Sequence, residues 1–559
     1  MFQGDRSWCT VKWLGRLAGR VAGTGALAAT MLSACALSDP STPVDDPDAP
    51  DDLSAIERAN ASVDADALPG LPSPGAAGIG DPLFPTLGNG GYEVERYDLE
   101  LRYETSDPLG PIDGTVRIIA RATQSLSRFN LDFGGDAVGA VRVNGLPAAF
   151  SRDGEDLVIQ PILPLLRGQF FLITVTHFVA RPRPIDPTVL ITPFFVTPSG
   201  NAWAFQPNNA HLVFPCNDHP SDMASFSFRI DVPEGTTAVA SGVETARFTI
   251  GDRTIYRFEQ AQPMATELAQ VVVGAFTVIS RGVHAGVTVR DVVPTSLVAD
   301  LEPKLASELD HLDFMQGLVG DYPFPTYGSL VGDARFGFAL ETQTLSLYSS
   351  TSFTRPPTSY EPIMVHELAH QWFGDSVAPK RWADVWANEG HATWYETSFR
   401  LGLDSPAFIS RMQLVYSFGD LFRRFLGPVA NPPGGDILTL FNSNVYDGGA
   451  LVLYALRQQV GDPVFQQIER EWVTRFRGKS ASTADFIALA SEVSGQDLTT
   501  FLTDWFYGTT TPPMPGHPDW TVRPAPPLAP AGVDSLAGMP PDLKLPALSG
   551  DDDPGLLRR

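Results

Sequence analysis

The stretch that decides the fold is 364–374, MVHELAHQWFG, in which His366 and His370 stand four positions apart. On a helix, positions i and i+4 share one face, so both imidazoles can reach one metal ion. Glu367 lies beside them and suits the general base that activates a water molecule. The pattern His-Glu-x-x-His alone also fits two surface histidines on a helix, because it arises by chance on the order of once per hundred proteins.

A third candidate ligand follows in 386–391, WANEGH. Glu389 stands after eighteen spacer residues, 371–388. A catalytic zinc site needs three protein ligands and one open position. His366, His370 and Glu389 supply two nitrogens and one carboxylate, so the sequence predicts one zinc ion per chain.

The surrounding sequence predicts an α+β multidomain chain. Alternating apolar and β-branched residues, as in 97–103, 115–120 and 170–175, favour strands throughout 92–290. Helical spacing then appears in 298–319, 359–373, 387–401, 405–425, 445–460, 463–476 and 483–493. We therefore expect an all-β domain at 91–295 and a mostly helical domain at 296–515.

Charge and composition limit the classes of function and the extent of the folded body. The chain has 559 residues and a net charge of −25, which argues against a nucleic-acid-binding protein. Segment 36–90 holds ten acidic residues, one basic residue and nine prolines, and the tail 516–559 holds nine more prolines. Such segments bury too little apolar surface to fold, so we expect a disordered acidic linker and a disordered tail.

The first 35 residues predict export. Arg6, Lys12, Arg16 and Arg20 precede a short apolar run that ends in Leu-Ser-Ala-Cys35. A basic region, a short apolar run and a small-residue exit are typical of a secretory signal, and the run is too short to span a bilayer. Leu-Ser-Ala-Cys resembles the bacterial lipobox, which predicts a lipid anchor at Cys35 and a location at the cell envelope; ordinary signal cleavage nearby is the alternative.

Several motifs together resemble the zinc aminopeptidases of the aminopeptidase N type. His-Glu-x-x-His, eighteen residues and Asn-Glu-Gly match the family's zinc site. Segment 338–342, FALET, stands where the family has Gly-Ala-Met-Glu-Asn. Segment 445–450, VYDGGA, resembles the block with the family's catalytic tyrosine, and Gln206 with 214–220, FPCNDHP, resembles the junction between the β domain and the active site. The resemblance implies a saddle-like β domain followed by a thermolysin-like catalytic domain.

The resemblance also implies roles for individual residues. Glu341 would bind the free α-amine of a peptide, with Gln206 and Ala339 lining the same subsite. Tyr446 would donate a hydrogen bond to the developing oxyanion. Glu396, seven positions after Glu389 on the same helix face, would orient a zinc histidine.

The resemblance thus implies an aminopeptidase acting on peptides with a free N-terminus. Phe338 and Asn208 depart from the family pattern, since the family has glycine at the first position and often an acid at the second. A related zinc hydrolase with endopeptidase or epoxide-hydrolase activity, and a surface-binding lipoprotein without turnover, are the alternatives.

Overall fold

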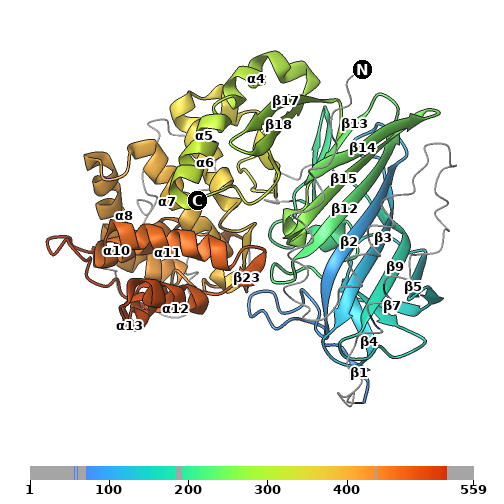
Figure 1. Ribbon diagram of the computed structural model, residues 1–559, viewed down its shortest axis with the longest axis horizontal. Helices are drawn as coiled ribbons and strands as arrows, with labels where there is room; N and C mark the ends of the chain where they lie inside the picture. The colour runs from blue at the N-terminus through green and yellow to red at the C-terminus, as the bar shows by residue number, and fades with distance from the viewer. Residues whose placement is uncertain (1–55, 57–59, 61–70, 184–191, 435–436, 525–559) are drawn as a thin grey trace, which may run out of the picture.

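The computed structural model describes residues 56, 60, 71–183, 192–434 and 437–524, and shows a β-rich half beside a helical half (Figure 1). This agrees with the predicted fold class. The predicted leader with Cys35 lies outside the described residues. In the described part of the chain, no helix combines the length and apolar character needed to cross a membrane.

Among the described residues, the β-rich half contains three sheets. In β3 (Ile112–Ala122) buried and more exposed side chains alternate, because successive residues face opposite sides of a sheet. The large sheet has the spatial order β14 (Val243–Ile250), β15 (Arg253–Met264), β12 (Ala224–Pro233), β2 (Tyr92–Tyr103), β3, β9 (Phe170–Ala180), β5 (Ala140–Val143) and β6 (Leu146–Pro147). The second sheet has the order β1 (Ser73–Pro74), β4 (Leu126–Asp132), β8 (Asp156–Gln160) and β7 (Ala149–Asp153). The third has the order β10 (Phe194–Thr197), β11 (Gly200–Trp203), β16 (Val271–Gly274) and β13 (Thr237–Ala240).

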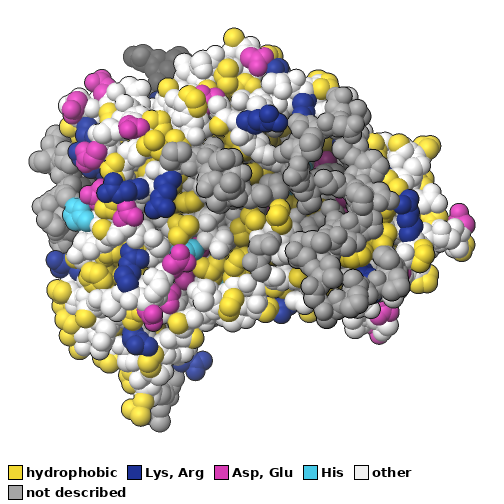
Figure 2. All heavy atoms as spheres, turned by 180° about the vertical axis from the view of Figure 1, so that it is seen from behind, with side chains coloured by type: hydrophobic (Ala, Val, Ile, Leu, Met, Phe, Trp, Pro, Cys, Tyr) yellow, Lys and Arg dark blue, Asp and Glu magenta, His cyan; other side chains and the backbone are white. Residues whose placement is uncertain are grey.

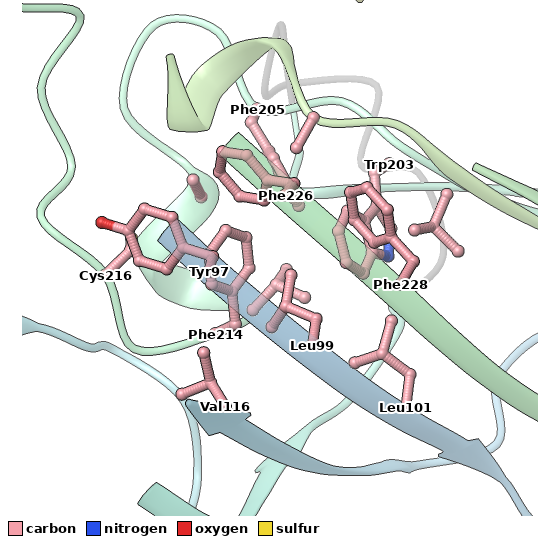
Figure 3. Packing of buried hydrophobic residues seen from close by; sticks show 14 of the residues in the cluster. Tyr97, Leu99, Leu101, Val116, Trp203, Phe205, Phe214, Cys216, Phe226 and Phe228 are labelled. Atoms are coloured by element: carbon pink, nitrogen blue, oxygen red, sulfur yellow. The ribbon is translucent and has the colours of Figure 1, made fainter. Parts of the chain in front are cut away.

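Aromatic side chains join the large sheet to β11 (Figure 3). The ring of Tyr97 stacks on Phe226 at 4.7 Å between centroids, and Trp203 stacks on Phe214 at 5.8 Å. Cys216 lies in the same core with no exposed surface, and burial raises the pKa of its thiol well above the usual value. A thiol in this environment is a packing group rather than a nucleophile.

The second half begins with a sheet that sequence periodicity assigned to the first. Its order is β17 (Phe276–His284), β18 (Val287–Pro294), β20 (Ser329–Gly332) and β21 (Ser346–Ser349), with β19 (Thr326–Tyr327) beside β18. We predicted the domain boundary at 295/296, but β17 and β18 pair within the sheet of the second half. Alternation predicts a strand but does not predict which sheet the strand joins. When strands are assigned by the sheet in which they pair, the boundary between the two halves lies before Phe276.

The helices of the second half follow the predicted segments. They are α4 (Val298–Leu305), α5 (Glu308–Val319), α6 (Pro357–His370), α7 (Trp386–Leu401), α8 (Pro406–Leu426), α9 (Ile437–Leu440), α10 (Ser443–Val460), α11 (Asp462–Arg475), α12 (Thr483–Ser494) and α13 (Thr499–Tyr507). Two short strands, β22 (Val377–Pro379) and β23 (Lys479–Ala481), pair in parallel. Short 3-10 helices are η1 (Ala210–Leu212), η2 (Thr266–Leu268), η3 (Thr295–Leu297), η4 (Ser352–Thr354) and η5 (Trp382–Asp384). Segment 298–319, expected as one helix, is divided into α4 and α5, and α9 and α13 were not predicted.

The end of the predicted linker, 71–90, is part of the folded body. Asp81 is 2% exposed, and its carboxylate accepts a hydrogen bond from the backbone N–H of Trp382 at 2.7 Å and contacts His219 Nε2 at 3.2 Å. The Phe84 ring meets Trp382 edge to face. This stretch therefore binds both halves, although its composition resembles that of a linker. The start of the predicted tail is also packed, since Trp520 stacks on Tyr454.

Candidate metal centre

The three predicted zinc ligands come together from two adjacent helices. His366 and His370 lie on the last two turns of α6, and Glu389 lies in the first turn of α7. Glu389 Oε2 is 3.3 Å from His366 Nε2 and 3.4 Å from His370 Nε2. Ligand atoms placed 2.0–2.1 Å from a tetrahedral zinc ion lie about 3.3 Å apart, so this donor set fits zinc.

The far nitrogens of both histidines have partners that orient the rings. His366 Nδ1 is 3.2 Å from Glu396 Oε2, and His370 Nδ1 is 3.2 Å from the carbonyl oxygen of Phe373. An Nδ1–H that donates to an oxygen leaves Nε2 as the ligand atom. The structure therefore places Glu396 in contact with His366, one of the two predicted zinc histidines.

The charges of the site depend strongly on one another. Burial alone would lower the pKa of His366, but hydrogen bonds to Glu389 and Glu396 raise it to about 9. Burial alone would raise the pKa of Glu389, but His370 and His366 lower it to about 2. Glu389 is thus held as a carboxylate, the form that binds a cation.

Glu367 and Tyr446 flank the metal ligands. Glu367 is 5% exposed, and burial with the neighbouring carboxylates raises its pKa to about 8 against the opposing effect of the two histidines. The Tyr446 ring stacks on His366, with 6.0 Å between ring centroids. Burial raises the pKa of Tyr446 well above its usual value, so the phenol keeps its proton and can donate a hydrogen bond.

Glu341 closes the site on the side of the β-rich half. One ligand atom each from Glu341, Glu367 and His370 lie within 4.8 Å of one another. Gln206 Nε2 donates a hydrogen bond of 2.6 Å to Glu341 Oε1, so the predicted pair meets across 135 positions of sequence. Ala339, predicted to line the same subsite, is half-buried and packs against the apolar cluster that contains Val331.

The bulky residue in the amine-binding motif has a structural explanation. The Phe338 ring meets Phe195 and Phe336 at 5.2 Å between centroids. Its side chain packs against the apolar core of the β-rich half. The replacement of glycine by phenylalanine therefore adds a contact between the two halves.

Three buried polar residues near the site were missed by the sequence reasoning. Gln371 donates from Nε2 to the Glu341 carbonyl oxygen and accepts from the Thr344 N–H. Glu267 and Asp375 are buried, and within the described residues their carboxylate oxygens have no hydrogen-bond partner. Burial and the charge of Glu341 raise the pKa of both acids well above the usual value. Gln371 directly follows the zinc-binding pattern, so its position in the sequence could have been used to predict it. No motif in the sequence around Glu267 or Asp375 indicates that either acid lies near the site.

Comparisons with protein families match this site and fold. Residues 311–505 match the Peptidase family M1 domain, and residues 202–268 match the Peptidase M1 N-terminal domain. Aminopeptidase M1-D of Oryza sativa subsp. japonica is 27% identical over 322 residues, which cover 54% of this chain and 36% of that protein. The chain thus spans about a third of the length of this curated relative.

Solved structures extend the likeness to both halves. An M1 zinc metallopeptidase from Deinococcus radiodurans, bound to a Tyr-Ser-Ala substrate, is 30% identical with a TM-score of 0.67, and the match covers 79% of this chain and 100% of that one. A two-domain M1 zinc metallopeptidase bound to L-arginine is 29% identical with a TM-score of 0.69, covering 78% and 99%. The fold and the site define a zinc metallopeptidase. The chain belongs to the M1 family of zinc metallopeptidases, which confirms the expected cofactor, one zinc ion per chain.

Proposed function

We propose that the protein is a zinc-dependent aminopeptidase that releases N-terminal residues from peptides outside the cytoplasm. The observation that carries the proposal is the position of Glu341, whose carboxylate lies beside Glu367 and His370 at the edge of the metal site. The amine nitrogen and carbonyl carbon of one residue are only about 2.5 Å apart. A carboxylate this close to the general base can therefore bind the α-ammonium of the residue whose carbonyl is attacked.

Each side chain has a distinct part in this reaction. Zinc, when bound, stabilises negative charge on the carbonyl oxygen and lowers the pKa of water. Glu367 accepts the proton of the attacking water and delivers it to the leaving amine. The Tyr446 hydroxyl donates a hydrogen bond to the oxygen that becomes negative. Glu341, held by Gln206, pairs with the substrate ammonium and fixes the register of the chain.

Glu367→Gln tests whether this site performs catalysis. The variant keeps the shape of the side chain but removes the proton acceptor, so we expect kcat to fall by about 10²-fold or more. Zinc content should stay at one per chain, because the three ligands are unchanged. Glu361→Gln on the same helix is the matched control and should keep full activity. A Glu367→Gln variant with normal turnover would refute the proposed role.

N-acetylated peptides test the aminopeptidase assignment separately. Acetylation removes the charge that Glu341 would bind, so we expect blocked peptides to be cleaved at least about tenfold more slowly than their free-amine counterparts. Glu341→Gln should slow the free-amine peptides and leave the blocked ones unchanged. Equal cleavage of both substrates by the unaltered protein would instead indicate an endopeptidase.

The proposed location rests on Cys35 and the preceding signal-like leader. A lipid on Cys35 would hold the enzyme at the cell envelope. Metabolic labelling with radioactive palmitate should mark the protein, and Cys35→Ser should abolish the label. Labelling that persists in the variant would exclude Cys35 as the anchor.

A further inference from the structure

One end of the β-rich half carries an exposed apolar loop. Ile162 is 64% exposed, Leu163 is 65% exposed and Leu166 is 48% exposed, all within the turn between β8 and β9. Leu71, at 94% exposure, stands two residues before β1. Figure 2 shows hydrophobic side chains at the lower end of this half, with Lys or Arg side chains just above them. Exposed apolar side chains that gather at one end of a domain mark a surface that binds a partner protein or a membrane.

Hydrogen bonds join the segments of this tip into one rigid unit. Ser73 N–H donates to the Ser125 carbonyl oxygen at 3.0 Å. Leu126 and Leu165 exchange two backbone hydrogen bonds of 2.8 and 2.9 Å. We call this surface the tip and define it as the segments 71–80, 121–131 and 161–170. The exposed leucines and isoleucine are therefore held outward by a paired backbone.

The charge of the tip is opposite to that of the whole protein. Its three segments contain Arg121, Arg128 and Arg167 and no aspartate or glutamate, whereas the chain has a net charge of −25. All three arginines are exposed. Arginine beside exposed aliphatic side chains suits the boundary of an anionic bilayer, where the guanidinium meets headgroups and the aliphatic groups meet acyl chains.

The chain that leads back to Cys35 also reaches this end of the molecule. Asn60 exchanges two hydrogen bonds with the backbone of Phe170, of 2.8 and 2.9 Å. Asn60 lies 25 positions after Cys35. A lipid on Cys35 would therefore tether the protein through a segment that joins the folded body at this end.

We propose that the tip docks on the lipid bilayer, with Ile162, Leu163, Leu166 and Leu71 entering the interface and the three arginines contacting anionic headgroups. The inference rests on the proposed lipidation of Cys35 and is independent of the peptidase activity. A single acyl chain binds membranes only marginally, so a second contact of this kind makes attachment stable. It also gives the protein a defined orientation on the membrane, with the tip facing the bilayer.

A fluorescent label on the tip tests the proposal. The full-length protein with Leu163→Cys carries an environment-sensitive dye (nitrobenzoxadiazole) and is reconstituted into vesicles of phosphatidylcholine with 30% phosphatidylglycerol. Val283→Cys is the matched control, because Val283 is an exposed apolar residue, at 72%, on the β17–β18 hairpin at the other end of the molecule (Figure 1). The protein without an introduced cysteine gives the background labelling of the chain's own cysteines.

The tip label should brighten roughly threefold on vesicles, since it leaves water for an apolar phase. Lipids brominated along the acyl chain should quench it, while the control label should stay unchanged. Omitting phosphatidylglycerol should weaken the response at Leu163. Equal responses at both positions, no response at Leu163, or failure of the proteins to float with vesicles would overturn the proposal. Peptide hydrolysis by the same samples reports the proposed activity independently.

Discussion

The contact between α7 and α10 predicts that one methyl group can impair catalysis from outside the site. Gly390 on α7 and Gly449 on α10 meet backbone to backbone, and a Cβ added at Gly449 would lie 2.7 Å from Gly390 Cα. Gly390 adjoins the predicted zinc ligand Glu389, and Gly449 lies one turn after Tyr446. The two glycines therefore set the spacing between the tyrosine and the metal ligands.

The displacement caused by Gly449→Ala can be worked out from this distance. Carbon atoms reach their best separation at about 3.5–4.0 Å, so the helices must part by about 1 Å. The atom in the way, Gly390 Cα, belongs to the backbone, so it cannot be relieved by a rotamer change as a side chain could. A misplacement of about 1 Å in a catalytic group costs on the order of 10²-fold in rate. Overpacking costs about 1–3 kcal/mol, and the better helix propensity of alanine offsets about 1 kcal/mol of it.

We expect kcat for aminoacyl-coumarin substrates to fall by about 10–100-fold in Gly449→Ala, with zinc still at one per chain. The ligands keep their geometry because none of them lies on α10. Gly317→Ala is the matched control, since a Cβ at this helical glycine meets no atom within 4 Å. That variant should keep its activity and gain up to about 1 kcal/mol in urea unfolding.

Normal turnover in Gly449→Ala would refute the reasoning, because it would show that the glycine contact does not position Tyr446. Loss of zinc together with activity would also contradict it, since the disturbance would then act on the ligands themselves. Metal content and activity must therefore be measured on the same preparation.

Three further predictions concern buried polar groups. Glu396→Gln should weaken zinc binding by about 10–100-fold in competition with a chelator, because His366 loses its charged partner. Burial lowers the pKa of His311 from 6.5 to about 4, so acidification through this range favours the unfolded state, which takes up the proton first. Between pH 7 and pH 4, the free energy of unfolding of His311→Phe should therefore fall by about 3 kcal/mol less than that of the unaltered protein, as measured by urea unfolding. The same pH dependence in both proteins would contradict this. Asp81→Ala should cost about 2–4 kcal/mol, since the N–H of Trp382 loses its acceptor.

Features of this protein that depend on neighbouring residues could be predicted from its sequence, whereas features that depend on distant residues could not. The helices carrying the zinc ligands follow from spacing, because helical periodicity is a property of neighbouring residues. Composition failed for 71–90, where acidic and proline-rich sequence predicted a linker. The burial of Asp81 between His219 and Trp382 depends on partners 138 and 301 positions away. The composition of the segment itself does not indicate that it has such partners.

The sequence by itself predicted the metal ligands, since an i, i+4 pair and a glutamate at the start of the next helix specify donors of the right kind. It also determined the order of β-rich and helical halves. Only the tertiary structure decided that Gln206 reaches Glu341, that two glycines set the distance to Tyr446, and that Glu267 and Asp375 are buried nearby. These contacts depend on how separate helices and strands pack in the folded protein. Packing brings together residues that are far apart in the sequence, and sequence periodicity reports only on neighbouring residues.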